Sequence, residues 1–268
     1  MLAEVGFAVA FVLRSLLLLT SSLLFAGCGV WRPTPVPMRT LTLPAACATR
    51  PETLIVFLPG SYSLPEDYVE HGFSDRLRQR QVAADILLVD AHLGYYSERD
   101  ILDRLQLDVI APARERGYRH IWLVGISVGA YGAMLYSSSA PARSAEIDGI
   151  VAIAPYLGNR RYATSVETSG GLKSWPGATQ AAPGDVDETL WRWLQTLVAR
   201  PETPLYLAYG RDDRFAYSDR VLAAALPADH VFSLPGGHDW PVWESLWERL
   251  VPILPLPIDR SCAKEAAR

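Results

Sequence analysis

The chain has 268 residues, of which 50% are hydrophobic and 20% charged, so it is long enough for one large globular domain with a well-developed core. Its formal net charge of −4 supplies no basic field of the kind that nucleic acid or an anionic membrane surface would require. Those partners are therefore disfavoured. The sequence shows no internal repeat with the period of a solenoid or a propeller.

The first residues have the pattern of a targeting segment. Arg14 precedes an apolar run over 15–26 that ends at Gly27 and Cys28, with small residues at the cleavage point. Residues 25–28, Phe-Ala-Gly-Cys, resemble the lipobox of a bacterial lipoprotein. The resemblance implies that 1–27 is a signal peptide and that Cys28 is acylated, which anchors the protein to a membrane. An uncleaved transmembrane anchor and an ordinary secretory signal are the alternatives, and all three export the domain.

Residues 28–50 are expected to form a tether. Three prolines alternate with other residues over 33–37, which favours an extended spacer. In lipoproteins an aspartate after the acylated cysteine often retains the protein in the inner membrane, and Gly29 stands at that position here. The resemblance therefore implies an outer-membrane lipoprotein that faces the periplasm or the exterior.

The other two cysteines lie at the two edges of the expected domain, which spans 51–260. An oxidising compartment would permit Cys47 and Cys262 to form a disulfide, and the alternative is two unrelated thiols near the ends of the domain.

Beyond residue 50, short apolar runs alternate with longer helical patterns, which predicts an α/β fold: a mostly parallel sheet flanked by helices. The expected strands are 53–58, 85–89, 120–124, 147–153, 204–208 and 229–234, and the expected helices are 65–81, 97–116, 128–138, 186–199, 218–226 and 241–253. In the last helix Trp243, Trp247 and Leu250 recur at helical spacing, which indicates a stripe buried against the sheet.

The interval 156–200 breaks this alternation, with a loop rich in Gly, Ser and Thr before its helix. A loop-plus-helix insertion between strands is a common form of lid over a cleft, although a long crossover is the alternative. Trp175, Arg160 and Arg161 would give such a lid side chains for contacting a substrate.

Residues 125–129 read Gly-Ile-Ser-Val-Gly, between the strand expected at 120–124 and the helix expected at 128–138. A serine on a sharp turn between strand and helix is lifted out of the sheet beside the first free N–H groups of the helix. The two glycines let the turn tighten and let the neighbouring backbone approach. We therefore predict that Ser127 is a nucleophile, against the alternative that it only caps a helix.

A serine nucleophile needs a histidine at the same edge of the sheet, after the carboxyl end of a strand. His120 and His230 precede or begin strands, and His71 lies inside an expected helix. His92 lies at the correct edge but precedes the serine in the chain, and we expect it to contact substrate. His238 follows the last strand and precedes the last helix, so it is the predicted base.

The histidine in turn needs a carboxylate. Asp212 and Asp213 both follow the strand expected at 204–208, and one of them could cap a helix or pair with an arginine. The order Ser127, aspartate, His238 resembles the α/β-hydrolase fold, which the chain matches over about residues 51–255. The Gly-x-x-Asp pattern of that family, read from Gly210, selects Asp213 over Asp212.

The same resemblance implies an oxyanion hole. One donor would be the N–H of Val128, directly after the nucleophile, and the other would come from the loop after an early strand. Here that loop is Pro59-Gly-Ser-Tyr62, with proline where the family usually has histidine. Ser61 is the expected donor, and Tyr62 is the alternative donor and an expected substrate contact.

The resemblance implies a serine hydrolase, esterase- or lipase-like, acting on a small-molecule ester or lipid through an acyl-enzyme. No cofactor is expected, and no HExxH, CxxC or acidic metal motif occurs. Thioester or peptide hydrolysis uses the same groups, and a non-catalytic envelope-binding module of the same fold is the alternative from another class.

Overall fold

The computed structural model describes residues 32–46, 50–178, 182, 184–200 and 203–259. The chain divides into two compact units, Met1–Thr34 and Pro35–Arg268, and the fold below is that of the second. The signal segment, Cys28, Cys47 and Cys262 lie outside the described residues, so lipidation and the disulfide stay predictions. Within the described ranges, no helix combines the length and the apolar character that a membrane crossing requires.

A seven-stranded sheet forms the centre of the fold, and its strand order is β1-β3-β2-β4-β5-β6-β7. All neighbouring strands are parallel except β1, which pairs antiparallel with β3 at the edge. The strands are β1 Thr40–Leu43, β2 Thr53–Leu58, β3 Ala84–Val89, β4 His120–Ile126, β5 Gly149–Ile153, β6 Leu205–Gly210 and β7 Val231–Leu234. β2, β5 and β6 are buried along their whole length, as continuous apolar runs in a parallel sheet should be.

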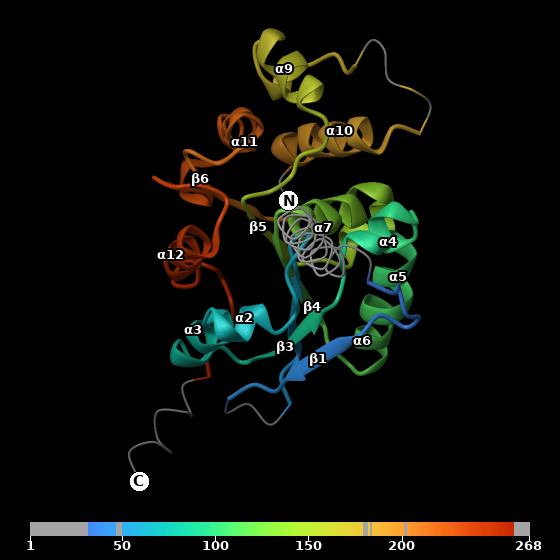
Figure 1. Cartoon of the computed structure of the whole chain (residues 1–268), viewed down its shortest axis with the longest axis vertical. Helices are drawn as coiled ribbons and strands as arrows, with labels where there is room; N and C mark the ends of the chain where they lie inside the picture. Colours follow the sequence, from blue (N-terminus) through green and yellow to red (C-terminus); the bar gives the residue numbers. More distant parts are fainter. Residues whose placement is uncertain (1–31, 47–49, 179–181, 183, 201–202, 260–268) are drawn as a thin grey trace, which may run out of the picture. The chain divides into compact units, whose positions relative to one another are not determined.

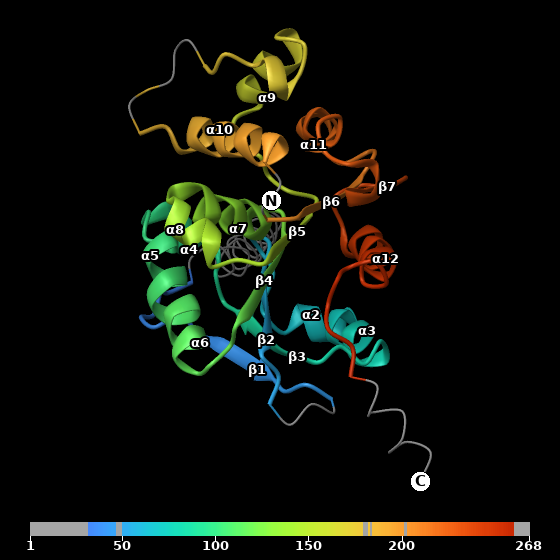
Figure 2. The ribbon, with the colours of Figure 1, turned by 180° about the vertical axis from the view of Figure 1, so that it is seen from behind.

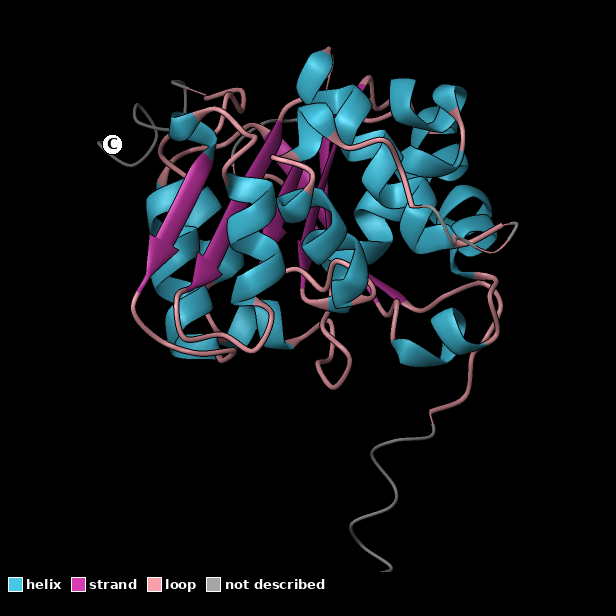
Figure 3. Cartoon of the chain, turned by 90° about the horizontal axis from the view of Figure 1, so that it is seen from above, coloured by secondary structure: helices cyan, strands magenta, loops and turns pink. Residues whose placement is uncertain are grey.

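Helices cover both faces of the sheet (Figures 1, 2 and 3). One face packs against α2 (Asp67–Glu70), α3 (Phe73–Gln79) and α12 (Trp240–Leu250), where Phe57 lies edge-on to Trp247. Trp243, Trp247 and Leu250 are buried there, which confirms the expected stripe. The opposite face packs against a longer set: α5 (Ile101–Arg104), the π-helical η1 (Leu105–Ile110), α6 (Ala111–Glu115), α7 (Val128–Ser139) and α10 (Val186–Ala199).

The remaining helical segments are short. They are α4 (Leu93–Ser97), α8 (Pro141–Ala145), α9 (Arg160–Thr168), η2 (Leu172–Ser174), α11 (Ala216–Ala223) and η3 (Ala228–His230).

The sheet begins earlier in the chain than expected. Residues 28–50 were expected to be a tether, yet Thr40–Leu43 form the edge strand β1, and Met38 is buried with its N–H donating to Asp108. The helix expected at 65–81 is divided into α2 and α3 because Gly72 adopts a φ of 70°. The helix expected at 97–116 begins at Ile101 and runs without a break to Glu115 as α5, η1 and α6, and the short α4 precedes it.

The interval 156–200 is an insertion between β5 and β6, and its described residues include two helical segments that were not expected, α9 and the short η2. The helix at 186–199 is present as α10, but α9 forms inside the stretch expected to be loop. Residues Tyr162, Ala163 and Val166 of α9 are buried, so the helix is held by tertiary packing and not by propensity. Trp175 is 2% exposed and its Nε1 donates to Ser165, so it packs inside the insertion instead of facing a cleft.

The register of the parallel strands brings several strand ends to one edge. Leu58 pairs with Gly125, Ile126 with Ile153, and Gly210 with Leu234. The residues that follow these strands therefore meet at the carboxyl edge of the sheet, where ligands bind in open α/β sheets.

Candidate active site

Ser127 lies on a strained turn between β4 and α7, with φ 55° and ψ −116°. A non-glycine residue in this region costs about 1–3 kcal/mol, so the surrounding structure must hold it there. The N–H of Ser127 donates to Ile153 O at 2.9 Å, and its carbonyl accepts from Tyr131 and Tyr156, each at 3.2 Å. The strain is therefore offset by three backbone hydrogen bonds.

The two glycines of the pentapeptide are required by close backbone contacts. A Cβ on Gly125 would lie 2.3 Å from Ala130 N, and one on Gly129 would lie 2.0 Å from Leu58 O. Contacts this short involve backbone, which cannot swing aside. The missing side chain at Gly125 therefore lets the start of α7 fold tightly onto the end of β4, and the missing side chain at Gly129 lets this turn press against the end of β2.

His238 joins Ser127 to Asp213. Its Nε2 lies 3.0 Å from Ser127 Oγ, and its Nδ1 lies 2.6 Å from Asp213 Oδ2. Asp213 can only accept, so Nδ1 carries the proton and Nε2 is free to accept from the serine hydroxyl. The Asp213 side chain is 0% exposed and the His238 side chain 12%. The other Asp213 oxygen accepts from Phe215 N at 2.8 Å, so the buried carboxylate is bonded at both oxygens.

Aromatic rings hold the imidazole on two sides. Phe215 and Trp243 both lie edge-to-face with His238, with ring centroids 5.1 and 5.0 Å away. These contacts limit rotation of the ring about its side-chain bonds. The sequence indicated only a buried position for Trp243 on α12 and no role for Phe215, since an aromatic side chain carries no signal of a contact with a catalytic histidine.

Asp212 has a different partner from Asp213. Its carboxylate accepts from Gly236 N at 2.9 Å, and its own N–H donates to Gly236 O at 3.0 Å. Asp212 thus ties the loop after β6 to the loop after β7, which carries His238. Of the two candidate acids, only Asp213 contacts the histidine.

The loop after β2 lies against the nucleophile. A Cβ on Gly60 would be 3.7 Å from Ser127 Cβ. Among the residues that the structure describes, no acceptor is bonded to the N–H of Ser61 or of Val128. Both N–H groups can therefore donate to another acceptor, and their role in an oxyanion hole stays a prediction.

The two expected substrate contacts differ in exposure. Tyr62 is 77% exposed on the loop after β2. His92 is 4% exposed, its Nδ1 accepts from Gly94 N at 3.1 Å at the start of α4, and its ring lies against Tyr95. His92 thus braces the chain after β3, a role that its position in the sequence did not distinguish from substrate contact.

Two residues of the insertion join it to the site. Asp187 on α10 accepts from Tyr131 Oη at 2.6 Å and from Asn159 N at 2.8 Å. Burial and the bonded Asp187 raise the pKa of Tyr131, so it stays a neutral donor. Tyr156 donates its N–H to the Ser127 carbonyl. The first turn of the insertion is therefore fixed to both α7 and the nucleophile.

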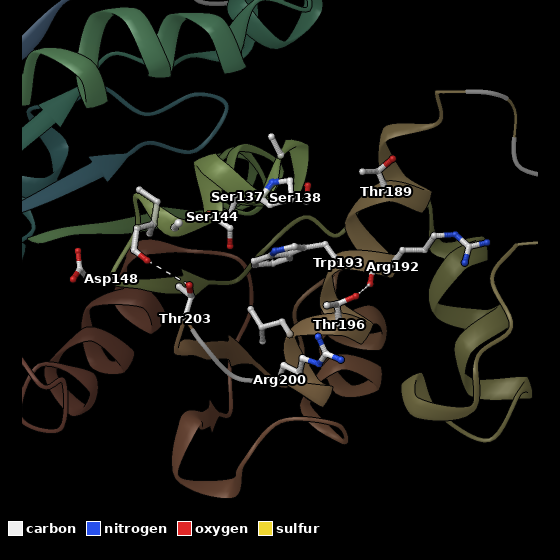
Figure 4. Close-up of a pocket in the computed structure, with 15 residues that line it drawn as sticks. Ser137, Ser138, Ser144, Asp148, Thr189, Arg192, Trp193, Thr196, Arg200 and Thr203 are labelled. Atoms are coloured by element: carbon white, nitrogen blue, oxygen red, sulfur yellow. Dashed lines mark hydrogen bonds between the residues drawn. The ribbon is translucent and has the colours of Figure 1, made fainter. Parts of the chain in front are cut away.

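A cavity of about 750 Å³ opens away from these residues (Figure 4). It lies between the end of α7, α8 and α10, and Trp193 and Arg200 line it beside Thr203. Asp148, directly before β5, also lines it, so it is at the amino edge of the sheet, opposite Ser127. The triad of Ser127, His238 and Asp213 does not line this cavity. Within the described ranges, no group of three His, Cys, Asp or Glu residues is arranged to hold a metal ion.

Comparison with known proteins supports the fold at low sequence identity. No family model and no curated protein sequence matches the chain. Among solved structures, it resembles S-formylglutathione hydrolase FrmB of Staphylococcus aureus, with a TM-score of 0.54, 11% identity, and coverage of 83% of this chain and 93% of that one. It also resembles Est1E of Butyrivibrio proteoclasticus, with a TM-score of 0.54, 14% identity, and coverage of 86% and 95%.

A third neighbour is the bottromycin epimerase BotH, with a TM-score of 0.50, 15% identity, and coverage of 81% and 94%. The chain therefore has the α/β-hydrolase fold, as its sequence predicts. An epimerase on the same fold means that the reaction must be argued from the site.

Asp219 is a second buried carboxyl behind the site. It lies on α11, is 0% exposed, and neither oxygen has a hydrogen-bond partner among the described residues. Burial raises the pKa of Asp219 well above its ordinary value, and the carboxylate of Asp213 raises it further. Asp219 is therefore held protonated in the folded protein, where a second negative charge beside Asp213 would be unfavourable.

The raised pKa makes stability depend on pH. An unfolded aspartate has a pKa of about 3.9, so the folded state binds this proton more tightly than the unfolded state does. The stabilisation is complete below the unfolded pKa and is lost as pH rises toward the folded pKa. We expect the free energy of unfolding to fall with pH above about pH 4, by up to about 1.4 kcal/mol per unit, and Asp219→Asn to remove this slope.

Urea unfolding of both proteins measures this slope, over a range from about pH 3.5, just below the pKa of an unfolded aspartate, to about pH 8. Below the unfolded pKa, both states of the wild type are protonated and the variant serves as an isosteric reference. Equal slopes in the two proteins would contradict a protonated Asp219.

Proposed function

We propose that this protein is a serine hydrolase that cleaves carboxylic esters through an acyl-enzyme. The observation that carries the proposal is the chain of contacts Ser127–His238–Asp213, with Ser127 on a strained turn at the carboxyl edge of the sheet. A hydrogen-bonded nucleophile, base and orienting acid is the arrangement by which a serine hydroxyl is activated. The fold of the neighbours, which include two hydrolases, is consistent with this chemistry.

In the first half of the reaction, Ser127 Oγ attacks the ester carbonyl carbon while His238 Nε2 takes the hydroxyl proton. The carbonyl oxygen becomes an oxyanion that accepts from the N–H groups of Ser61 and Val128. Collapse of this intermediate breaks the bond to the alcohol oxygen, which receives the proton from His238. The acyl group remains bonded to Ser127.

In the second half, His238 takes a proton from water and the resulting hydroxide attacks the acyl carbon. The bond to Ser127 Oγ breaks, the serine recovers its proton from His238, and the acid product leaves. Asp213 accepts a hydrogen bond from the Nδ1–H of His238 throughout the cycle. It stabilises the imidazolium, which forms once in each half of the reaction. The predicted lid at 156–200 would begin beside the nucleophile, because the N–H of Tyr156 is bonded to the Ser127 carbonyl.

We expect Ser127→Ala to lower kcat/KM for a short p-nitrophenyl ester by about 10⁴-fold or more, because the nucleophile is removed. A fluorophosphonate probe should label the wild type and not the variant. The Tm of the variant should be no lower, since alanine keeps the backbone contacts of the turn. Undiminished turnover in Ser127→Ala, or a folded wild type that is never labelled, would favour a non-catalytic binding module.

The two adjacent aspartates provide a matched pair. Asp213→Asn should lower kcat by about 10³- to 10⁴-fold, because an amide stabilises the wrong imidazole tautomer. Asp212→Asn keeps an acceptor oxygen for Gly236 N–H, so its effect should be below about threefold. Steady-state kinetics on the same ester measures both, and a greater loss in Asp212→Asn would refute the assignment of the acid.

We also propose that the domain is exported and attached to a membrane by an acylated Cys28, facing the periplasm or the exterior from the outer membrane. The support is the sequence of residues 14–28, with its charged, apolar and small-residue sections. A lipid anchor would hold the enzyme near lipid or envelope esters.

Cells expressing the full chain with radiolabelled palmitate should yield labelled protein, and Cys28→Ala should yield none. A Cys47→Ala variant controls for loss of a cysteine in general. Label retained in Cys28→Ala, or absent from the wild type, would mean that the segment is a transmembrane anchor or an ordinary signal.

A further inference from the structure

A second, smaller cavity adjoins the candidate active site. Its volume is about 350 Å³, and it is lined by residues 156–160 at the start of the insertion and by Arg214, Phe215, Tyr217 and Ser218 around the start of α11. Helices α9 and α11, which follow these two segments, lie side by side in Figures 1 and 2. The cavity is thus bounded by the insertion on one side and by the loop that carries Asp213 on the other.

Two of the lining residues contact the triad. Tyr156 donates its N–H to the Ser127 carbonyl at 3.2 Å, and the ring of Phe215 lies 5.1 Å from that of His238, centroid to centroid. A molecule in this cavity would therefore be separated from Ser127 and His238 by a single layer of residues, so the cavity can hold the far end of a substrate whose carbonyl lies at Ser127.

The cavity contains two arginines with no carboxylate beside them. The Arg160 guanidinium lies 4.0 Å from the centroid of the Tyr217 ring, and that of Arg214 lies 4.9 Å from the centroid of Phe215. Stacking on a ring orients a guanidinium while leaving the N–H donors around its edge free for other partners. No aspartate or glutamate is among the residues that line the cavity.

Neighbouring carboxylates do not neutralise this pair. In the part of the chain that the structure describes, neither Arg160 nor Arg214 has a carboxylate oxygen within ion-pairing distance. Four acidic groups of the adjacent elements are bonded elsewhere: Asp187 to Tyr131 and Asn159, Asp185 to Arg161 and Tyr162, Glu167 to Tyr217, and Asp213 to His238 and Phe215. Asp219 on α11 is fully buried and does not line the cavity. Two unpaired cations at one cavity in a chain of net charge −4 are the arrangement that an anionic ligand would stabilise.

We propose that Arg160 and Arg214 form an anion-binding subsite, and that the substrate is an ester carrying a carboxylate or phosphate group a few bonds from its scissile carbonyl. This inference rests on the proposed ester hydrolysis and narrows its substrate class. The arginines bind and orient the anionic end while Ser127 attacks the carbonyl. Loop 156–160 can hold Arg160 in position because the carboxyl group of Asp187 packs against this loop. A Cβ on Gly158 would lie 2.3 Å from that carboxyl group.

The test compares anionic esters with neutral partners of the same shape. One pair carries the charge on the acyl side, mono-p-nitrophenyl adipate and its methyl ester; the other carries it on the alcohol side, 4-acetoxybenzoate and its methyl ester. We expect kcat/KM to favour the anionic member of at least one pair by about 5- to 30-fold at low salt, and the preference to shrink as salt rises. The pair that shows the preference identifies the side of the ester that carries the anion.

Arg160→Gln and Arg214→Gln should each reduce this preference, and the double variant should abolish it, with turnover of the neutral esters unchanged. Arg220→Gln is the matched control, because it removes the same charge from α11 at a position that does not line the cavity. Inorganic phosphate and glutarate, added as competitors, distinguish the two anions: the one that suppresses the preference at lower concentration identifies the group.

Failure of the inference is distinguishable from failure of the proposed function. Equal kcat/KM for anionic and neutral esters in both pairs, unaltered by the double variant, would overturn the anion subsite while leaving ester hydrolysis intact. No turnover of any of the four esters, together with an unlabelled Ser127, would overturn both. A preference that survives the double variant but is lost in Arg220→Gln would mean that the general field of the protein, and not the cavity, selects the anion.

Discussion

The site depends on the contact between the backbone of Gly129 and the end of β2. The carbonyl of Leu58 comes so close that a methyl group at residue 129 would overlap it. This contact sets the distance between the loop after β2, which carries Ser61, and the turn that carries Ser127. Both partners in this contact are backbone atoms, so no side chain can move aside to make room. The backbone of Ser127 is therefore held at its strained φ.

Around this fixed turn, the structure separates two buried carboxyl groups by their surroundings. Asp213 has an imidazole and a backbone N–H as hydrogen-bond partners in its buried position. Asp219 has no such partner and keeps its proton. The two carboxyl groups interact, because the charge of Asp213 adds to the effect of burial in raising the pKa of Asp219.

The sequence predicted the parts of this arrangement that follow from the order of the elements along the chain and from the carboxyl edge of the sheet. Short apolar runs indicated a parallel sheet, and the carboxyl edge of such a sheet collects Ser127, Asp213 and His238 whatever the details of packing. It did not predict β1, a four-residue strand directly after a proline-rich stretch, or α9, in which four of nine residues are Thr, Ser or Val with low helix propensity. It could not bring Arg160 and Arg214 to one cavity, because their approach depends on how α9 packs against α11. The exposed Tyr62 and the buried His92 were equivalent in the sequence, since burial there depends on the helix that His92 itself begins.

The pairing of Asp212 with Gly236 has a mechanical consequence. Gly210 packs directly on the Gly236 carbonyl, and two hydrogen bonds join Asp212 to Gly236, so the loops that carry the acid and the base are one rigid piece. A displacement of either loop would carry Asp213 and His238 together and keep their 2.6 Å contact. The 3.0 Å contact from His238 to Ser127 is then the joint at which the two halves of the triad can separate. A motion that activates or inactivates the nucleophile would therefore make or break the hydrogen bond between His238 Nε2 and Ser127 Oγ.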